Sequence, residues 1–328
     1  MVRPLLPLLV AAVAAAVTAL ATGDTLPRLP PDATAGPRTP ACFGAASHDP
    51  DRPCINPRLR NSMVPRPGEL ADLPSAPCAG VRVDGLLTVC TYGVPSARAT
   101  RTVALVGDSH AAHWRAALDP VARSEGWHGV SLARSSCPLS TAPRDVPEPN
   151  RSDCVRWNRD VLRWLGEHPE VDTLIVSQLT GGKGVIGPDG HDSLAAREQG
   201  YLEAWSRVPA SVRRIIVIRD TPKTLRSGRM APCVTRAVAR RRAAGPTCSV
   251  SRRDALDPDA AVMAARSMRS PRVRSIDLTP YFCGRRRCEP VIGGVLAYKD
   301  AHHLTPAYMT TMAPYLRRAL VAVLTSLP

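Results

Sequence analysis

The chain has 328 residues, of which 44% are hydrophobic and 22% are charged. This composition supports a sizeable core and excludes an intrinsically disordered chain. The formal net charge is +15, but two phenylalanines and six tyrosines offer few rings for stacking single-stranded nucleic acid, which we do not expect as a partner. The sequence has a single long apolar stretch, so a multi-pass membrane protein is excluded as well.

Residues 1–21 have the pattern of a secretory signal peptide. Arg3 is followed by an apolar run that ends in the small-x-small sequence Ala19-Leu20-Ala21. An uncleaved N-terminal anchor is the alternative, because the run is close to the shortest length that spans a bilayer. Either interpretation predicts an exported, extracytoplasmic protein, secreted or anchored to the outer face of the membrane.

Ten cysteines support this location. In an exported chain they favour disulfides over metal sites, and no pair has the CxxC spacing of a zinc ribbon. The sequence alone cannot fix their connectivity. Proximity along the chain suggests that neighbours pair, namely Cys42 with Cys54, Cys78 with Cys90, Cys137 with Cys154, Cys233 with Cys248, and Cys283 with Cys288.

Some of the positive charge lies in short arginine clusters at 240–242, 252–253 and 285–287. Because these clusters are scattered and each lies near a cysteine, solvated loops are the simpler interpretation. Attraction to anionic cell-wall polymers or lipid headgroups is the alternative.

Residues 22–95 are rich in proline, glycine and short polar residues. They are predicted to form a proline-rich linker and then a cysteine-containing lead-in without a core of its own. The main folded domain is predicted at 96–328.

Within that domain, short apolar strands alternate with amphipathic helices. This alternation predicts a parallel sheet covered on both faces, a three-layer α/β/α sandwich. Ser152 is predicted to cap a helix in which Val155, Val161, Leu162 and Leu165 recur, and Pro306 suits a first helical turn. Strands are predicted at 102–106, 129–133, 173–177, 214–218 and 273–278, and further helices at 112–124, 193–207, 258–267 and 306–324.

The first predicted strand runs into Gly107-Asp108-Ser109-His110. In a parallel sheet the working site lies beyond the carboxyl ends of the strands. A serine directly after such a turn is well placed as a nucleophile, and the amides that open the next helix can face developing negative charge. The α/β-hydrolase elbow Gly-x-Ser-x-Gly is not present, because Ala111 stands at its second glycine.

A base for this serine is predicted just before the last helix, where Asp300 precedes His302 and His303. Either histidine could be the base. Residues three apart project to the same side of a tight turn, so Asp300 is expected to orient His303 while the other ring nitrogen faces Ser109.

A metal site is the other interpretation of these segments. It lacks a His-Glu-x-x-His motif, so we expect neither a metal nor an organic cofactor. Its candidate ligands are Asp108, His110, His113, Asp300 and His302.

These motifs resemble those of the SGNH/GDSL hydrolase superfamily. More closely, residues 78–325 resemble the SGNH domain at the C-terminus of bacterial integral-membrane O-acyltransferases that modify surface polysaccharides. The resemblance implies a flavodoxin-like sheet, with Ser109 as nucleophile, Asp300 as orienting carboxylate and His303 as general base. Its signatures lie at 103–114, 135–138, 219–222 and 290–306.

The superfamily's glycine and asparagine blocks, which supply oxyanion-hole donors, are not plainly present. By position, Ser135 or Ser136 and the pair Ser177-Gln178 would replace them. The predicted oxyanion hole therefore consists of the Ser109 amide, Ser136 and Gln178.

The sequence thus predicts an exported serine esterase or O-acyltransferase that acts on acyl esters, acetyl above all, of cell-surface glycans. The expected partner is an acylated surface polysaccharide or another cell-envelope glycan. Related proteins fuse the domain to a membrane acyltransferase, so this chain is expected to be free-standing or to act with a separate one. The alternative function is a non-catalytic cell-wall or glycan-binding module that retains the SGNH fold.

Overall fold

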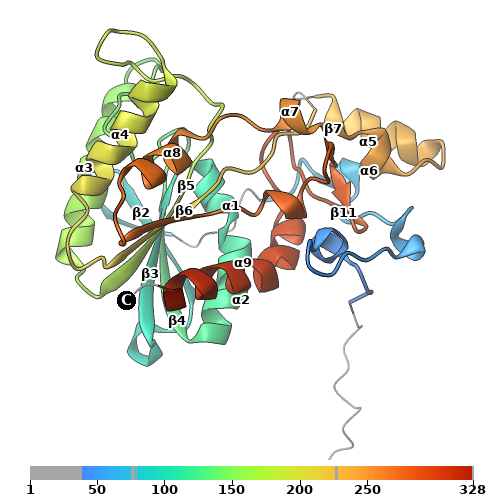
Figure 1. Ribbon diagram of the computed structural model, residues 1–328, viewed down its shortest axis with the longest axis horizontal. Coiled ribbons are helices and arrows are strands. Elements are labelled where there is room, and N and C mark those ends of the chain that lie inside the picture. Colours follow the sequence, from blue (N-terminus) through green and yellow to red (C-terminus); the bar gives the residue numbers. More distant parts are fainter. Residues whose placement is uncertain (1–38, 75–77, 79, 226–227, 327–328) are drawn as a thin grey trace, which may run out of the picture. The chain divides into compact units, whose positions relative to one another are not determined.

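The computed structural model describes residues 39–74, 78, 80–225 and 228–326 (Figure 1). The chain divides into two units, Met1–Thr39 and Pro40–Pro328, and the description concerns the second. The predicted signal peptide or anchor lies outside the described residues. Among the described residues, no helix is both long and apolar enough to span a bilayer.

In the described part of the chain, seven strands form the central sheet in the order β1-β2-β4-β3-β5-β6-β8. The five strands from β4 to β8 run parallel in the order of a flavodoxin-like sheet. The strands are β1 (Val81–Asp84), β2 (Leu87–Gly93), β3 (Arg101–Gly107), β4 (Trp127–Ala133), β5 (Val171–Ser177), β6 (Arg214–Ile218) and β8 (Val273–Ile276).

Helices cover both faces of this sheet, which confirms the predicted three-layer sandwich. Leu105 faces one layer, which contains α2 (Arg115–Glu125) and α9 (Pro306–Ser326). Val106 faces the other layer, because successive residues of a strand point to opposite faces. This second layer contains α3 (Asn150–Glu167), α4 (Leu194–Ser206) and α8 (Ala260–Ser267).

Strands β1 and β2 fall in the segment that was predicted to be a lead-in. They extend the sheet by antiparallel pairing, and β2 buries Leu87, Cys90 and Tyr92. The folded unit therefore begins before the predicted boundary at residue 96. The sequence signal is weak because β1 is only four residues long and exposes Val81 and Val83.

Helix α3 differs from its prediction at the N-terminus. It begins at Asn150 with Pro149 as N-cap, so Ser152 lies inside the first turn and does not cap it. The backbone amide of Ser152 instead donates to the carboxylate of Glu148 at 3.1 Å. Val155, expected on the apolar face, is 50% exposed, because the buried face follows Cys154, Trp157, Val161 and Leu165 and leaves Val155 outside it.

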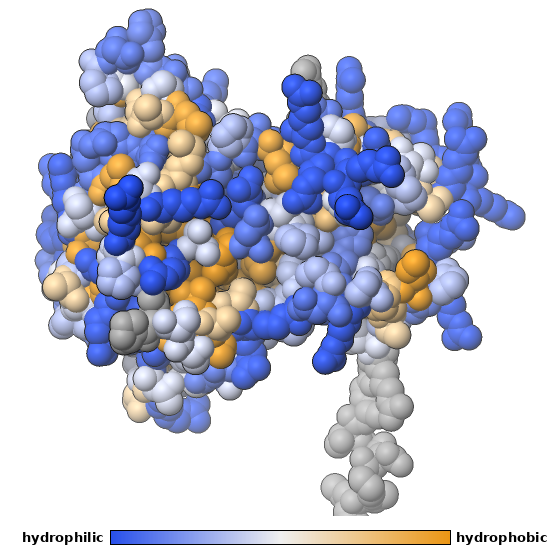
Figure 2. Space-filling model, in the orientation of Figure 1, coloured by the Kyte–Doolittle hydropathy of each residue, from blue (hydrophilic) through white to orange (hydrophobic). Residues whose placement is uncertain are grey.

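A smaller lobe follows β6 and resumes after β8, and the sequence analysis did not predict its elements. Figure 2 shows hydrophilic side chains projecting from the region of α5 and α7. The arginines at 240–242, 253 and 285–287 are exposed there. The lobe contains α5 (Met230–Ala239), α6 (Ala244–Thr247), β7 (Val250–Ser251), α7 (Arg252–Ala255), β9 (Arg287–Cys288), β10 (Val291–Ile292) and β11 (Val295–Leu296).

Short 3-10 helices complete the described secondary structure. They lie at Gly44–His48, Pro57–Leu59, Pro67–Glu69, Ser96–Arg98 and Thr279–Tyr281.

All ten cysteines are paired in the structure, each with its neighbour in the sequence. The five bonds join the pairs that proximity suggested: Cys42–Cys54, Cys78–Cys90, Cys137–Cys154, Cys233–Cys248 and Cys283–Cys288. Two of these bonds, Cys233–Cys248 and Cys283–Cys288, lie in the smaller lobe.

The protein isolated from its native compartment is expected to contain almost no free thiol. Thiol titration under denaturing, non-reducing conditions tests this expectation, and the same sample after reduction should yield all ten thiols. Two or more reactive thiols per chain before reduction would refute the five-bridge structure.

Candidate active site

Ser109 begins helix α1 (Ser109–His113), directly after strand β3. Asp108 is the N-cap of this helix, and its carboxylate accepts a hydrogen bond from the backbone amide of His110 at 2.8 Å. The same carboxylate accepts the amide of Leu179, which follows β5, at 3.0 Å. The turn that presents Ser109 is thus held to the neighbouring strand.

Gly107 allows this turn to form against β5. Its φ is +149°, a region that residues with a side chain rarely adopt. It pairs with Ser177 in the sheet, and a Cβ atom at Gly107 would overlap the carbonyl oxygen of Ser177. Glycine is therefore required here by both the backbone angle and the close approach of the strands.

The substitution Gly107→Ala is expected to lower the free energy of unfolding by about 3 kcal/mol. Backbone strain of this kind costs about 1–3 kcal/mol, and the overlap with β5 adds to it. Urea unfolding measures the change. Gly68→Ala is the control, because no atom lies within 4 Å of its added Cβ, and it should change stability by less than about 0.5 kcal/mol. An unchanged unfolding midpoint for Gly107→Ala would contradict this account.

Ser109, His303 and Asp300 form a continuous chain of hydrogen bonds. Nε2 of His303 lies 2.9 Å from Oγ of Ser109, and Nδ1 of the same ring lies 2.7 Å from Oδ2 of Asp300. Because an ionised carboxylate only accepts, Nδ1 carries the proton and Nε2 accepts the hydroxyl hydrogen of Ser109. The structure therefore brings together the three residues that the sequence analysis assigned as nucleophile, base and orienting carboxylate.

Asp300 is held by its own turn. Its Oδ1 accepts the backbone amides of His302 at 3.0 Å and His303 at 2.8 Å. Burial by itself would raise the pKa of this carboxyl, but hydrogen bonds from the His303 ring and these two amides outweigh burial and hold the pKa well below its usual range. Asp300 is therefore ionised at neutral pH and fixes the tautomer of His303.

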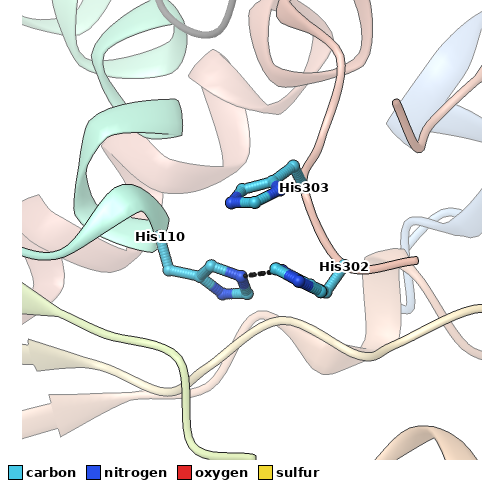
Figure 3. Close-up of side chains that lie close together, drawn as sticks. All are labelled: His110, His302 and His303. Atoms are coloured by element: carbon cyan, nitrogen blue, oxygen red, sulfur yellow. Dashed lines mark hydrogen bonds between the residues drawn. The ribbon is translucent and has the colours of Figure 1, made fainter. Parts of the chain in front are cut away.

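His302 is turned toward His110 rather than toward the serine. Its Nδ1 lies 2.9 Å from Nε2 of His110. Figure 3 marks this hydrogen bond with a dashed line. Burial, together with the charges of His110 and His303, lowers the pKa of His302 to about 4, so its ring is neutral at neutral pH. The ring that faces Ser109 belongs to His303, at the three-residue spacing from Asp300.

A second carboxylate–histidine pair lies behind this turn. His110 is fully buried, and its Nδ1 lies 2.5 Å from Oδ1 of Asp220. Burial alone would lower the pKa of His110, but the charge and hydrogen bond of Asp220 outweigh it and raise the pKa. Oδ2 of Asp220 accepts the amide of Thr180 at 2.7 Å and its hydroxyl at 2.9 Å.

The sequence analysis gave Asp220 no role of its own. A signal was available, because Asp220 follows the strand predicted at 214–218 at its carboxyl end, where the site residues of a parallel sheet gather. The pairing with His110 depends on the order of strands in the sheet, which the sequence alone did not specify.

The two candidate oxyanion donors lie in the segments that flank β3. Gly107 pairs with Ala133 on one side and Ser177 on the other, so Ser136 and Gln178 each follow a strand next to Ser109. Among the described residues, neither side chain forms a hydrogen bond with Ser109 or His303.

Their surroundings differ. Ser136 is exposed, has a φ of +61°, and lines a cavity of about 500 Å³ together with Arg134, Asn150 and Lys183. Gln178 is 1% exposed, and neither atom of its amide group has a hydrogen-bond partner among the described residues. Gln178 thus retains an unpaired donor beside the serine turn, but that donor is enclosed.

The structure does not bring together all five metal ligands that were considered from the sequence. The carboxylate of Asp108 binds backbone amides, and neither nitrogen of buried His113 has a partner among the described residues. Instead, one nitrogen each from His110, His302 and His303 lies within 4.8 Å of the others.

The sequence model of the SGNH domain that occurs fused to AT3 domains matches residues 77–318. The chain belongs to this family. It is an SGNH-type enzyme of acyl-ester chemistry, a hydrolase or an acyltransferase. The match begins just before β1, in agreement with the inclusion of both antiparallel strands in the fold.

A solved structure supports this fold at low sequence identity, and a second shows a weaker similarity. The periplasmic domain of a lipopolysaccharide acetyltransferase from Salmonella ser. Paratyphi A has a TM-score of 0.51 at 12% identity, and the alignment covers 70% of this chain and 90% of that domain. A presumed acylhydrolase from Bacteroides fragilis has a TM-score of 0.39 at 12% identity, with 80% and 95% covered. No curated protein sequence matches the chain significantly.

Proposed function

We propose that the protein is an exported serine esterase or O-acyltransferase that acts on acyl groups, acetyl above all, esterified to cell-surface glycans. The observation that carries this proposal is the hydrogen-bonded chain from Ser109 through His303 to Asp300 at the carboxyl edge of the parallel sheet. A serine hydroxyl bonded to an imidazole whose other nitrogen is bonded to a carboxylate is the arrangement that activates serine for acyl transfer.

The proposed reaction proceeds through an acyl-enzyme. Oγ of Ser109 attacks the acyl carbonyl carbon while Nε2 of His303 takes the hydroxyl proton. When the ester C–O bond breaks, His303 returns that proton to the departing alcohol oxygen, and Asp300 stabilises the imidazolium that exists between these steps. His303 then activates either water or a sugar hydroxyl, which removes the acyl group from Ser109.

The negative oxygen of the tetrahedral intermediate requires hydrogen-bond donors. We assign the backbone amide of Ser109 as one donor, because this amide opens α1. Ser136 and Gln178 are the proposed further donors, on the basis of their places beside β3. The amide nitrogen of Gln178 has no acceptor among the residues that the structure describes, so it gives up no hydrogen bond when it binds the oxyanion.

The substrate class and the location rest on separate observations. The side chains of His303 and Asp300 are 31% and 39% exposed, so the site is open enough for an acyl group carried on a polymer. Five disulfides support an oxidising, extracytoplasmic compartment. If transfer dominates over hydrolysis, a separate membrane acyltransferase is the partner that would supply the acyl group.

The alternative considered from the sequence, a non-catalytic glycan-binding module, is disfavoured by membership in this enzyme family. The two are distinguished by incubating the purified protein and its Ser109→Ala variant with an O-acetylated surface polysaccharide. The enzyme proposal predicts release or transfer of acetyl groups by the wild type alone. Polysaccharide binding by both proteins, without loss of acetyl groups, would support the binding module instead.

A further inference from the structure

Three imidazole rings lie close together, as Figure 3 shows, and one of them, His303, is hydrogen-bonded to Ser109. His110 comes from α1, and His302 and His303 come from the segment before α9. The nitrogens that they present to one another all lie within 4.8 Å, and Nε2 of His110 is 2.9 Å from Nδ1 of His302. In a tetrahedral zinc site, ligand nitrogens lie about 3.4 Å apart, so small side-chain shifts would suffice to reach that spacing.

Two of these rings are hydrogen-bonded to a carboxylate through the nitrogen that would not bind the metal, as zinc-binding histidines usually are. Nδ1 of His110 is hydrogen-bonded to Asp220, and Nδ1 of His303 is hydrogen-bonded to Asp300. In each ring the carboxylate fixes the orientation and makes the opposite nitrogen, Nε2, a better electron donor. The reaction proposed above requires only one such pair, and the second pair is left without a role in it.

The charge around the rings also suits a dication. Asp220 and Asp300 each place a carboxylate within hydrogen-bond distance of a ring. The carboxylate of Asp108, the N-cap of α1, lies on the same turn as His110. The serine hydroxyl and the buried ring of His113, whose centroid is 5.0 Å from that of His110, also face the cluster.

We propose that His110, His302 and His303 form a Zn²⁺ site whose occupation blocks the serine chemistry. The ligand atoms are Nε2 of His110, Nδ1 of His302 and Nε2 of His303. When zinc binds, the hydrogen between Nε2 of His110 and Nδ1 of His302 is released to solvent as a proton, so both nitrogens can donate a lone pair to the metal. The hydrogen bond between His303 and Ser109 breaks, and the serine hydroxyl keeps its proton. Nε2 of His303 has one lone pair, so it either binds the metal or accepts the serine proton. Metal binding and acyl transfer are therefore mutually exclusive.

Calorimetric titration of the full chain with a zinc salt tests the site directly, in protein without a polyhistidine tag. The Ser109→Ala variant is used because it keeps all three ligands and cannot turn over substrate, so the binding result does not depend on the proposed reaction. We expect one ion per chain. His302→Ala in the same background should weaken binding at least about 100-fold, whereas His191→Ala, an exposed loop histidine, should bind like its parent.

Absence of binding, or equal binding by the His302→Ala protein, would overturn the site, and a lone His110–His302 hydrogen bond would then be the correct description. The inhibitory role has its own readout in the hydrolysis of a small aryl acetate. Zinc should lower the wild-type rate, a chelator should restore it, and the rate that remains in His302→Ala should not respond to zinc. Zinc that binds through His302 yet leaves the wild-type rate unchanged would overturn the inhibitory role.

Discussion

The substitution His303→Ala is expected to lower the turnover of a small aryl acetate by at least about a thousandfold, whereas His302→Ala should keep most of the activity. Nε2 of His303 is 2.9 Å from Oγ of Ser109, so its removal leaves the serine without a base. His302 contacts Nε2 of His110 instead, and no hydrogen bond joins its ring to Ser109 in the described part of the chain.

The two variants differ by one position in one turn, so each serves as the control for the other. Initial rates at saturating ester are measured for both, and circular dichroism verifies that both are folded. An inactive His302→Ala protein beside an active His303→Ala protein would show that the base is assigned to the wrong histidine.

The substitution Asp300→Asn is expected to reduce turnover by about a thousandfold to ten-thousandfold while leaving the fold intact. The neutral amide cannot stabilise the imidazolium, and its NH₂ group can favour the wrong tautomer of His303. Asp189→Asn is the matched control, because Asp189 is exposed in a loop outside the site and should keep full activity.

The pH dependence sharpens this test. Hydrogen bonds hold the pKa of Asp300 well below its usual range, so the carboxylate stays ionised when the solution is mildly acidic. The carboxylate should therefore stay ionised from about pH 8 down to about pH 5, and carboxyl-carbon NMR of the folded protein measures its ionisation directly. A signal of Asp300 that titrates above about pH 5 would mean that the carboxyl becomes protonated there and that its hydrogen bonds are weaker than described.

The regular part of the fold was predictable from local sequence pattern. The strand predicted at 214–218 coincides with β6, and each of the other four predicted strands overlaps a parallel strand of the sheet. These strands are buried on both faces and therefore appear as apolar runs. The strands of the smaller lobe are only two residues long and β1 is exposed, so none of them produces the longer apolar run that predicts a buried strand.

In the candidate site, too, some residues could be predicted from local sequence pattern and others depend on tertiary contacts. Ser109, Asp300 and His303 could be predicted because a strand end and a short turn place each of them in a recognisable local motif. Asp220 could not, because its role depends on the packing of β6 beside β5 and on a contact with His110 across the sheet edge. For Gln178 the sequence indicated a place beside the serine, but only the tertiary structure shows that its amide is enclosed.

The central claim is that Ser109 is a nucleophile activated by His303, and a serine-directed fluorophosphonate tests it most directly. The purified wild type, His303→Ala and His302→Ala proteins are incubated with the probe, and the modified residue is located by peptide mass spectrometry. The account predicts a single adduct on Ser109 in the wild type and in His302→Ala, and a greatly slowed reaction in His303→Ala. Folded wild-type protein that remains unlabelled, or an adduct on a different residue, would contradict it.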